Sequence, residues 1–458
     1  MSMNGKLPDT LLYGLLARLA GAGSYAEIFM EQSVKQAAVY ENMRLDRVEN
    51  TFDAGVAMRV IKGAETYFAY TNSFSEKSLT ETADELLRAF ENGRTSDIAV
   101  TLKESVQYYK SPADTDISDK IELAAQMDKA ARLDKRIVQS TSLFAENRRE
   151  TRVINTDGSD ISQSLCYVTG YTAAVASDGK DMQQGYIALG GAMGREEASG
   201  LDFIKNSEDA AKLAIQNLTA RHAPSGMMTV VIGSTAGGTM VHEAVGHGLE
   251  ADLACNGMSV YAGKLGEKVA SEFISVADDA TLSCKRGSFI YDDEGIKGSS
   301  NLLIDKGVLK RYMSDRLYAA KEGIPLTGNG RRQSYRHRPI VRMTNTMILP
   351  GVHAPDDIIK SVQKGLYVAR MGGGQVNTVT GDFVFEVTEG YLIENGKIGE
   401  PVKNATLIGN GPRVMSEIDM TGSDLGFGLG TCGKEGQGVP VSDAQPTLRI
   451  PEITVGGR

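Results

Sequence analysis

The spacing of hydrophobic residues predicts that helices and strands alternate in the first part of the chain. Apolar residues at helical spacing indicate an amphipathic helix that begins near Asp9. Between Tyr25 and Asn72, short β-favouring runs are separated by Gly, Asn and Asp, a pattern typical of strands and turns. The four runs are AEIFMEQS, RVENTF, AMRVIK and TYFAYTN. A helical pattern returns over residues 76–92.

The following stretch begins with a second predicted helix, over residues 118–135. Asp119 and Glu122 stand three residues apart near its start, in the arrangement of a capping box. Strand patterns dominate residues 137–195, and a further helix is expected over 207–221. Two Asp-Gly pairs predict turns between these strands: Asp157-Gly158 and Asp178-Gly179.

Two breaks in the pattern divide the chain into three parts. Residues 110–114, with the sequence KSPAD, are typical of a linker, and Ala223-Pro224-Ser225-Gly226 follows the last of these helices. These breaks predict an N-terminal domain, a middle domain and a C-terminal domain. The expected ranges are 1–112, 113–224 and 225–458.

The C-terminal part begins with an apolar strand, MMTVVIG, followed by a glycine-rich turn, STAGGT, and a helix. Such a turn before a helix is one way to bind phosphate, but no Gly-Lys-Ser/Thr sequence follows here, which argues against it. From residue 270 onward the chain is rich in glycine and strand-like, with one clear helix at about 355–365.

Composition narrows the function without deciding it. The chain has 458 residues, of which 41% are hydrophobic and 23% charged, ordinary values for a globular protein of two or three domains. A net charge of −9 argues against nucleic-acid binding, which depends on Lys and Arg neutralising phosphates. Arg18 interrupts the N-terminal apolar run, so we expect neither a signal peptide nor a membrane span. Four scattered cysteines without a CxxC pair fit a reducing compartment, and we expect a cytoplasmic protein.

The helix of the C-terminal part carries the sequence His242-Glu243-Ala244-Val245-Gly246-His247, in a chain with only 5 histidines. Two imidazoles and a neighbouring carboxylate suit a hydrolytic zinc site, where the metal acidifies a bound water and the carboxylate takes its proton. Five residues of a regular helix turn the two rings roughly 140° apart, too far to share a metal. Either a π-type widening or a helix end near Gly246 would bring them together.

Two histidines are too few for a catalytic zinc, which usually has three protein ligands and one open position. The third-ligand candidates are Glu250, the cysteines Cys166, Cys255, Cys284 and Cys432, and the histidines His222, His337 and His353. Glu250 is close in sequence to His247. Cys432 lies between glycines that would allow a loop to approach closely, and a thiolate is a strong zinc ligand. Cys166 lies in a strand-like run and is expected in the core.

Two polar segments have less specific patterns. Residues 328–346 contain five arginines, Arg331, Arg332, Arg336, Arg338 and Arg342, and form either a solvated surface loop or a strip that binds a carboxylate or carbonyl. Asp292-Asp293-Glu294-Gly295 lacks the alternating ligands of a calcium site, so a β-turn is expected there.

In these motifs, the sequence resembles the TldD/PmbA family, and within it the TldD-type catalytic members. The resemblance runs from about residue 10 to the C-terminus. It is densest in HEAVGHGLEAD (242–252), YDDEG (291–295), TGNGRRQSYRHRPIVRMTNT (327–346), residues 372–411 and CGKEGQGVPV (432–441). The sequences STAGGT and ACNG, which flank the metal motif, depart from the family pattern.

The resemblance implies an α+β protein with an N-terminal α/β domain, a middle segment and a larger, β-rich C-terminal domain that carries the metal motif on a helix. It also implies a cytosolic zinc metallopeptidase. It implies zinc bound by His242, His247 and Cys432, which favours Cys432 over Glu250, with Glu243 as the catalytic carboxylate. It also implies a PmbA-type (TldE-like) partner in a heterodimer, or a homodimer, and trimming of short, unfolded or modified peptides. The family has been described as a modulator of DNA gyrase, an effect we expect to be indirect because nothing in the composition supports DNA binding.

The sequence thus predicts a zinc-dependent peptidase that hydrolyses unfolded or modified peptides. Glu243 is expected to act as general base, and Arg336 or His337 to steady the oxyanion or the peptide backbone. Two alternatives compete with this hypothesis. A non-catalytic peptide-binding scaffold would bind no metal, and a regulator of DNA gyrase would have measurable affinity for gyrase or DNA.

Overall fold

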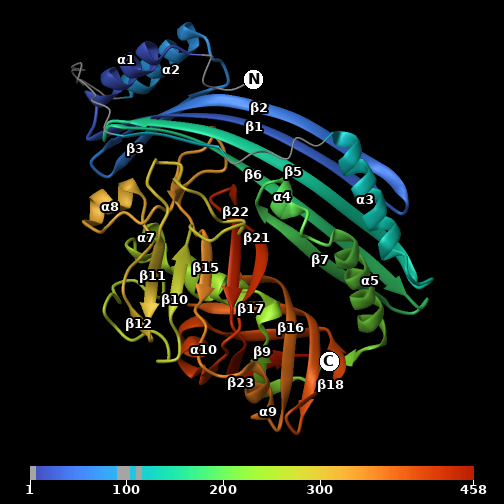
Figure 1. Cartoon of the computed structure of the whole chain (residues 1–458). Helices are drawn as coiled ribbons and strands as arrows, with labels where there is room; N and C mark the ends of the chain where they lie inside the picture. The colour runs from blue at the N-terminus through green and yellow to red at the C-terminus, as the bar shows by residue number, and fades with distance from the viewer. Residues whose placement is uncertain (1–6, 90–103, 110–115, 458) are drawn as a thin grey trace.

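The computed structural model describes residues 7–89, 104–109 and 116–457. It confirms an α+β protein in which a long curved sheet arches over a compact, β-rich C-terminal body (Figure 1). We call the curved sheet the arch. The linker expected at 110–114 and the boundary at 112 lie outside the described residues. No helix in the described ranges is both long and apolar enough to cross a membrane.

The arch is a seven-stranded sheet in the order β3-β2-β1-β5-β6-β4, with β7 pairing the second half of β6. All its neighbours are antiparallel except β4 and β6, which are parallel. Segments expected to belong to separate N-terminal and middle domains therefore contribute strands to one sheet. The strands are β1 (Tyr25–Glu41), β2 (Arg44–Lys62), β3 (Glu65–Thr71), β4 (Glu104–Tyr109), β5 (Ile137–Asn155), β6 (Ser159–Ser177) and β7 (Met182–Ala192).

The prediction of several short strands between Tyr25 and Asn72 is wrong. RVENTF and AMRVIK belong to one strand of 19 residues, β2, which runs straight through Asp53-Ala54-Gly55. In the sequence Gly55 suggested a turn, but in the structure it allows the ring of Tyr335 to lie close to the β2 backbone. A Cβ on Gly55 would lie 2.1 Å from Cε2 of Tyr335, a ring supplied by the C-terminal body. The turns expected at Asp157-Gly158 and Asp178-Gly179 are confirmed, with positive φ at both glycines.

Four helices of the arch were expected, and their ends differ from the prediction. α1 (Asp9–Ala20) has no side-chain cap, and Asp9 lies in its first turn. The N-cap of α3 (Ile117–Ala131) is Asp116, which accepts a hydrogen bond from the Ser118 amide, so the capping box at Asp119 and Glu122 is wrong. The other two expected helices are α2 (Glu76–Arg88) and α5 (Phe203–Thr219), and a short fifth helix, α4 (Arg195–Ala198), was not predicted.

The C-terminal body contains two larger sheets. One has eight strands, five of which close into a ring through β16-β9-β23-β19-β17 and a further pairing of β17 with β16; β18, β8 and β20 extend it. Its strands are β8 (Arg221–His222), β9 (Gly226–Ile232), β16 (Lys364–Val376), β17 (Asp382–Glu394), β18 (Lys397–Lys403), β19 (Ala405–Asn410), β20 (Met420–Thr421) and β23 (Leu448–Gly456). The largest hydrophobic core of the described residues lies in this body.

The second sheet has six strands in the order β12-β11-β10-β15-β22-β21, so β21 lies at its edge. Its strands are β10 (Val276–Asp279), β11 (Ser300–Asp305), β12 (Val308–Leu309), β15 (Asn345–Ile348), β21 (Gly426–Lys434) and β22 (Gln437–Gln445). β13 (Gly330–Arg331) and β14 (Ile340–Val341) pair separately. Besides the expected helix α9 (Pro355–Lys360), the body has three short helices that were not predicted: α7 (Ala251–Ala254), α8 (Arg316–Glu322) and α10 (Gly411–Glu417).

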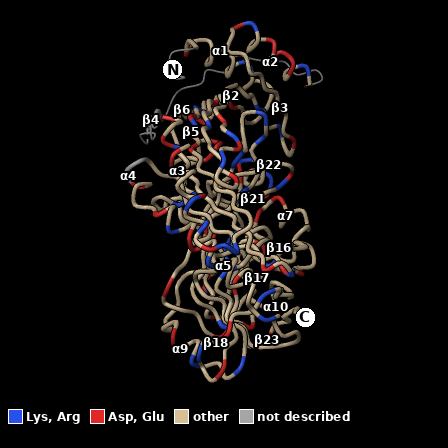
Figure 2. The backbone as a smooth tube through the Cα atoms, turned by 90° about the vertical axis from the view of Figure 1, so that its right-hand side faces the viewer, with Lys and Arg blue, Asp and Glu red and all other residues tan. Residues whose placement is uncertain are grey.

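A buried network of charges joins the arch to the body. Glu294, fully buried, forms an ion pair with Arg59 of β2, which lies 3.9 Å from Glu27 of β1. Glu27 in turn pairs with the buried Arg332, and Asp293 pairs with Arg149 of β5 at 2.9 Å. In Figure 2, basic and acidic segments are interspersed over both parts of the molecule.

This network corrects one sequence interpretation and confirms another. Arg331, Arg332 and Arg342 are at most 4% exposed, so the basic segment 328–346 is not a solvated loop, although Arg336 and Arg338 are exposed. Their hydrogen bonds to backbone carbonyls and acids compensate for desolvation. The turn expected at Asp292–Gly295 is confirmed by the hydrogen bond from the Gly295 amide to the Asp292 carbonyl and the positive φ of Gly295.

Replacing Glu294 with Gln should strongly destabilise the protein. Arg59 would stay buried without its main counter-charge, and breaking a buried ion pair typically costs about 3–5 kcal/mol. Glu400→Gln provides the matched control, because the Arg221–Glu400 pair is solvent-exposed and contributes little. Denaturant unfolding of both variants checks the prediction, which equal midpoints for Glu294→Gln and the wild type would contradict.

Candidate active site

The candidate site begins where β9 of the C-terminal ring ends. The chain turns through η2 (Ser234–Ala236) and the two glycines of STAGGT into α6 (Thr239–Val241). Gly237 has a φ of 71° and packs on Gly428 of β21, where a Cβ would lie 2.9 Å from the Gly428 Cα. The Gly238 amide donates to Asp443 Oδ1 at 3.1 Å. The glycines of this turn therefore bring the helix against strands β21 and β22.

A π-helical turn, η3 (His242–Gly246), joins the two histidines of the motif. The His247 amide donates to the His242 carbonyl, five residues back, so the widened turn brings both rings to one side as the first of the two sequence-based alternatives requires. The ring centroids lie 5.1 Å apart with the planes nearly perpendicular. After His247 the chain tightens into a short 3₁₀ turn, η4 (His247–Leu249).

Surrounding side chains satisfy the backbone of this irregular segment. The Tyr261 hydroxyl donates to the Ala244 carbonyl at 3.1 Å, and the Ser259 hydroxyl donates to the Gly248 carbonyl at 2.6 Å. At Gly246 a Cβ would lie 2.1 Å from Met343 Sδ, so any other residue would require the buried Met343 side chain to move. These contacts keep the widened turn in place.

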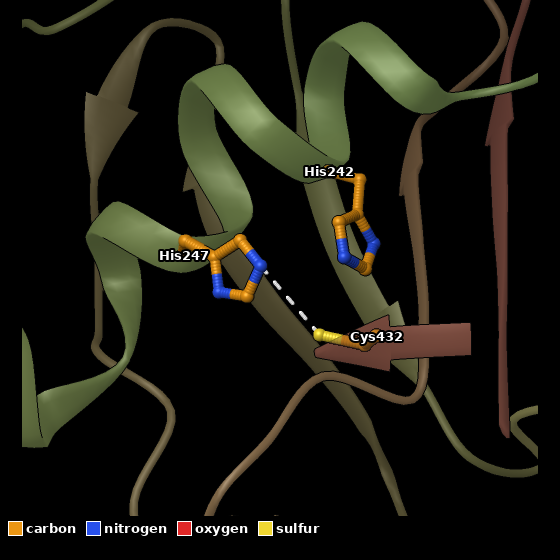
Figure 3. Close-up of side chains that lie close together, drawn as sticks. All are labelled: His242, His247 and Cys432. Atoms are coloured by element: carbon orange, nitrogen blue, oxygen red, sulfur yellow. Dashed lines mark hydrogen bonds between the residues drawn. The ribbon is translucent and has the colours of Figure 1, made fainter. Parts of the chain in front are cut away.

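Cys432 of β21 completes a cluster with the two histidines (Figure 3). Its Sγ lies 3.5 Å from His247 Nε2, and the ligand-type atoms of the three residues all lie within 4.8 Å of one another. His242 and Cys432 are 5% and 3% exposed. Arg342 holds the strand in position by donating to the Cys432 carbonyl. Two imidazoles and a thiol at this separation are suitable for binding one metal ion.

Glu250 lies behind His247 and outside this cluster. Its Oε2 is 2.9 Å from His247 Nδ1, which leaves Nε2 of the same ring directed at Cys432. Lys434, two residues after Cys432 on β21, donates to Glu250 at 3.0 Å, to Asp252 at 2.6 Å and to the Val341 carbonyl at 3.0 Å. Glu250, weighed in the sequence as a third ligand, thus contacts the ring of His247 from outside the cluster.

The electrostatics of the cluster favour a thiolate. Burial would raise the pKa of Cys432, but hydrogen bonds and charge interactions with His242 and His247 outweigh it and lower the pKa to about 5. Burial also opposes the charged form of Glu250, yet Lys434 and His247 lower its pKa to about 2. Glu243 behaves in the opposite way, because burial raises its pKa while the two histidines only partly offset the shift.

A cleft of about 720 Å³ opens beside the cluster. Both His242 and Glu243 line it, between β7 of the arch on one side and β16, β21 and β22 of the body on the others. The remaining polar groups on its walls include Lys285, Arg370 and Asp443. A second cavity, of about 580 Å³, lies beside β17, β19 and α10 and contains none of the cluster.

The other candidate residues lie elsewhere. Cys166 is a buried core residue, as expected. His222, His353 and Cys255 are absent from the cluster, while Cys284 lines the cleft without joining it. Neither Arg336 nor His337 lines the cleft: Arg336 pairs with Asp53 of the arch, and His337 Nδ1 lies 3.0 Å from Ser334 Oγ. Their expected part in substrate binding stays a prediction.

Sequence reasoning missed three residues that support the cluster. Lys434 was detectable in principle, because residues two apart on a strand face the same side and Lys434 follows Cys432 by two. Arg342 was noted only as part of the basic segment 328–346, and no local pattern points to Asp443; both reach the site through the tertiary fold, by contacts with Cys432 and Gly238.

Comparison with known proteins assigns the chain to a class. Residues 26–96 match domain 1, residues 110–218 the central domain and residues 225–457 the C-terminal domain of PmbA/TldA metallopeptidases. A match along nearly the whole chain, together with a buried His/His/Cys cluster at a cleft, defines a metallopeptidase. The chain belongs to the PmbA/TldD family.

Its relatives carry corresponding names. A metalloprotease TldD homolog of Haemophilus influenzae is 38% identical, over 94% of this chain and 93% of that protein. The homolog of Buchnera aphidicola is 37% identical, over 94% and 92%. A zinc metalloprotease TldD homolog of Saccharolobus solfataricus is 34% identical over 67% of each chain.

Solved structures share the fold. TldE from Thermococcus kodakarensis superposes with a TM-score of 0.76, at 19% identity, over 98% of this chain and all of that chain. A Thermotoga maritima protein described as a proposed modulator of a DNA gyrase has the same TM-score, at 22% identity, over 94% and 96%. At these identities the likeness concerns the fold alone.

The unusual acidity of Cys432 is directly measurable. In protein dialysed against a chelator, the ultraviolet absorbance of the thiolate should rise near pH 5, whereas an ordinary thiol ionises near pH 9. Cys432→Ser should remove this step, because burial raises the pKa of Cys255 instead of lowering it. A titration of wild-type protein that is flat from pH 4 to 7 would contradict the assignment.

Proposed function

We propose that this protein is a zinc-dependent peptidase that hydrolyses unfolded or modified peptides. The observation that carries the proposal is the convergence of His242, His247 and Cys432, from two distant parts of the sequence, beside Glu243 at the wall of a cleft. Buried imidazole and thiolate groups are ordinary zinc donors, and three of them leave a position open for catalysis.

The donor set fits a metal in a second respect. Nδ1 of the buried His242 has no hydrogen-bond partner among the described residues, and an unpaired buried polar atom is costly. His242, His247 and Cys432 would hold the ion, with Glu250 and Lys434 fixing the ring of His247. Bound zinc would polarise the scissile carbonyl and acidify a water molecule.

Glu243 is the proposed general base. It would accept a proton from the attacking water and deliver it to the leaving amine. Burial raises its pKa above that of an ordinary glutamate, which brings it closer to the acidity that such proton transfer requires. Glu243 follows His242 directly, so the proposed base and the two histidine ligands share one helical segment.

Strand β21 is a suitable binding edge for an extended peptide. Within the described residues it pairs only with β22, and its residues Phe427–Thr431 line the cleft. Main-chain hydrogen bonds to such an edge recognise a backbone with little dependence on sequence. A folded domain cannot present its backbone in this way, which favours unfolded substrates.

We also propose a PmbA-type (TldE-like) subunit as partner, or a second copy of this chain, and a cytoplasmic location. The partner proposal is supported by the shared fold of TldE, and the location by the unpaired cysteines of the described residues. Size-exclusion chromatography with light scattering should find a dimer or heterodimer on which activity depends. Efficient digestion of a stably folded protein by the isolated monomer would refute both the assembly and the substrate class.

The purified protein should contain about one zinc per chain. His242→Ala, His247→Ala and Cys432→Ala should each abolish binding, because each removes a direct ligand. Glu250→Gln should retain zinc with an affinity about 10–100-fold lower, the usual effect of losing the partner that orients a ligand. Elemental analysis and chelator competition measure both effects. If Cys432→Ala kept its full zinc content and Glu250→Ala lost its zinc, Glu250 and not Cys432 would be the third ligand.

Glu243→Gln should keep the metal and the fold but lose peptide hydrolysis. Removing a general acid–base group typically lowers the rate by about 10²–10⁴-fold. Turnover of an unstructured fluorogenic peptide measures the loss, and zinc content and unfolding midpoint serve as controls. Wild-type turnover in this variant would favour the non-catalytic scaffold, and measurable affinity for gyrase or DNA would favour the regulator.

A further inference from the structure

Lys285 is a cation on the wall of the catalytic cleft without an acidic partner. It is half-buried and lies in the loop before β11, next to Cys284. Its Nζ stands 3.8 Å above the ring centroid of Phe427, the second residue of β21, which lines the same cleft. No carboxylate of the described residues lies within ion-pair distance of it. Burial lowers the pKa of its ammonium group, so the free charge has a cost that a bound anion would remove.

The other long cation of the cleft is in a different situation. Arg370 of β16 donates to Glu389 of β17 at 3.0 Å. At the far end of the same sheet, Lys403 is likewise paired with Asp181 at 2.7 Å. Three acids of the described residues line the cleft. Glu197 accepts a hydrogen bond from the Gly194 amide at 2.9 Å, and Glu243 and Asp443 are directed to the histidine cluster and the Gly238 turn. Lys285 is therefore the cleft cation available to a substrate.

The contact of Lys285 with Phe427 fixes the distance, measured along β21, between Lys285 and the His/His/Cys cluster. Phe427, beneath its ammonium group, and Cys432, in the metal-type cluster, are five residues apart on one strand. At roughly 3.3 Å per residue the two sites lie about 16 Å apart along the strand. A peptide extended along the edge of β21 with its scissile bond beside Glu243 would then have a group about four or five residues away at Lys285.

From this arrangement we propose that Lys285 binds a carboxylate of the substrate, and that the protein prefers peptides with a carboxylate four or five residues from the bond it cleaves. The carboxylate that every unmodified peptide has is its C-terminus. An aspartate or glutamate side chain is the second source of the same chemistry. Lys285 would bind the carboxylate at one end of β21, an edge that accepts many peptide sequences. This contact would therefore fix which peptide bond lies beside Glu243. The proposal rests on the proposed peptidase function and identifies its substrate class.

The test uses one unstructured peptide sequence made in three forms: with a free C-terminal carboxylate, with a carboxamide, and with a carboxamide plus an aspartate at the terminal position. Each form is assayed for hydrolysis, with KM and kcat separated, and for binding to full-length Glu243→Gln by fluorescence anisotropy. Lys285→Met keeps the aliphatic stem over Phe427 but removes the charge, and Lys285→Arg keeps the charge. Lys397→Met, an exposed position on β18 away from the cleft, is the matched control.

Wild-type protein and Lys397→Met should bind the carboxylate form about tenfold more tightly than the carboxamide, the scale of one charged hydrogen bond in a partly solvated cleft. Lys285→Met should bind both forms as weakly as the wild type binds the carboxamide, with the loss in KM rather than kcat, and Lys285→Arg should restore the preference.

The aspartate form decides which carboxylate is the ligand. If it recovers the preference, acidic side chains serve as well as the C-terminus; if not, the C-terminus is the ligand. A preference that persists in Lys285→Met, or its absence from the wild type, overturns the proposal. Failure to hydrolyse any form would refute the peptidase function, while the binding assay would still decide the role of Lys285.

Discussion

The π-helical turn between His242 and His247 is the constraint on which the rest of the site depends. A regular helix would point the second ring away from the first, so the extra residue in this turn is what allows both to face Cys432. Such a turn is unfavourable alone. Here the Tyr261 and Ser259 hydroxyls satisfy its carbonyls, and Met343 packs where Gly246 leaves no side chain. The metal-type geometry is thus stabilised by the core of the body, outside the motif itself.

Strand β21 and the buried charges extend this constraint to the cleft. Cys432 and Lys434 project from the same strand, one toward the histidines and the other toward Glu250, which contacts His247. The arch, whose strand β7 lines the cleft, is joined to the body by ion pairs of Glu294 and Arg332 with residues of β1 and β2. Removing either partner would leave a charge in the protein interior, so the arch and the body are strongly coupled.

The sequence predicted what is local and periodic. The hairpin turns followed from glycine positions, and the widened helix at His242–His247 was one of two alternatives that the spacing of the histidines required. The single long strand β2 was not predictable, because Gly55 looks like a turn until Tyr335 is placed against it. The choice between a solvated loop and a binding strip for the basic segment could not be made from the sequence, because the distant groups that neutralise the arginines were not known.

The pairing of β9 with β23 has a consequence for how the protein is made. Gly226 is registered against Val455, so the strand that leads into the histidine motif is completed by a strand far later in the sequence. Cys432 likewise reaches the two histidines from a distant part of the sequence. During synthesis, domains fold in order from the N-terminus, and contacts between distant residues form slowly. The arch can therefore form first, while the His/His/Cys cluster can assemble only after β21 and β23 have been made.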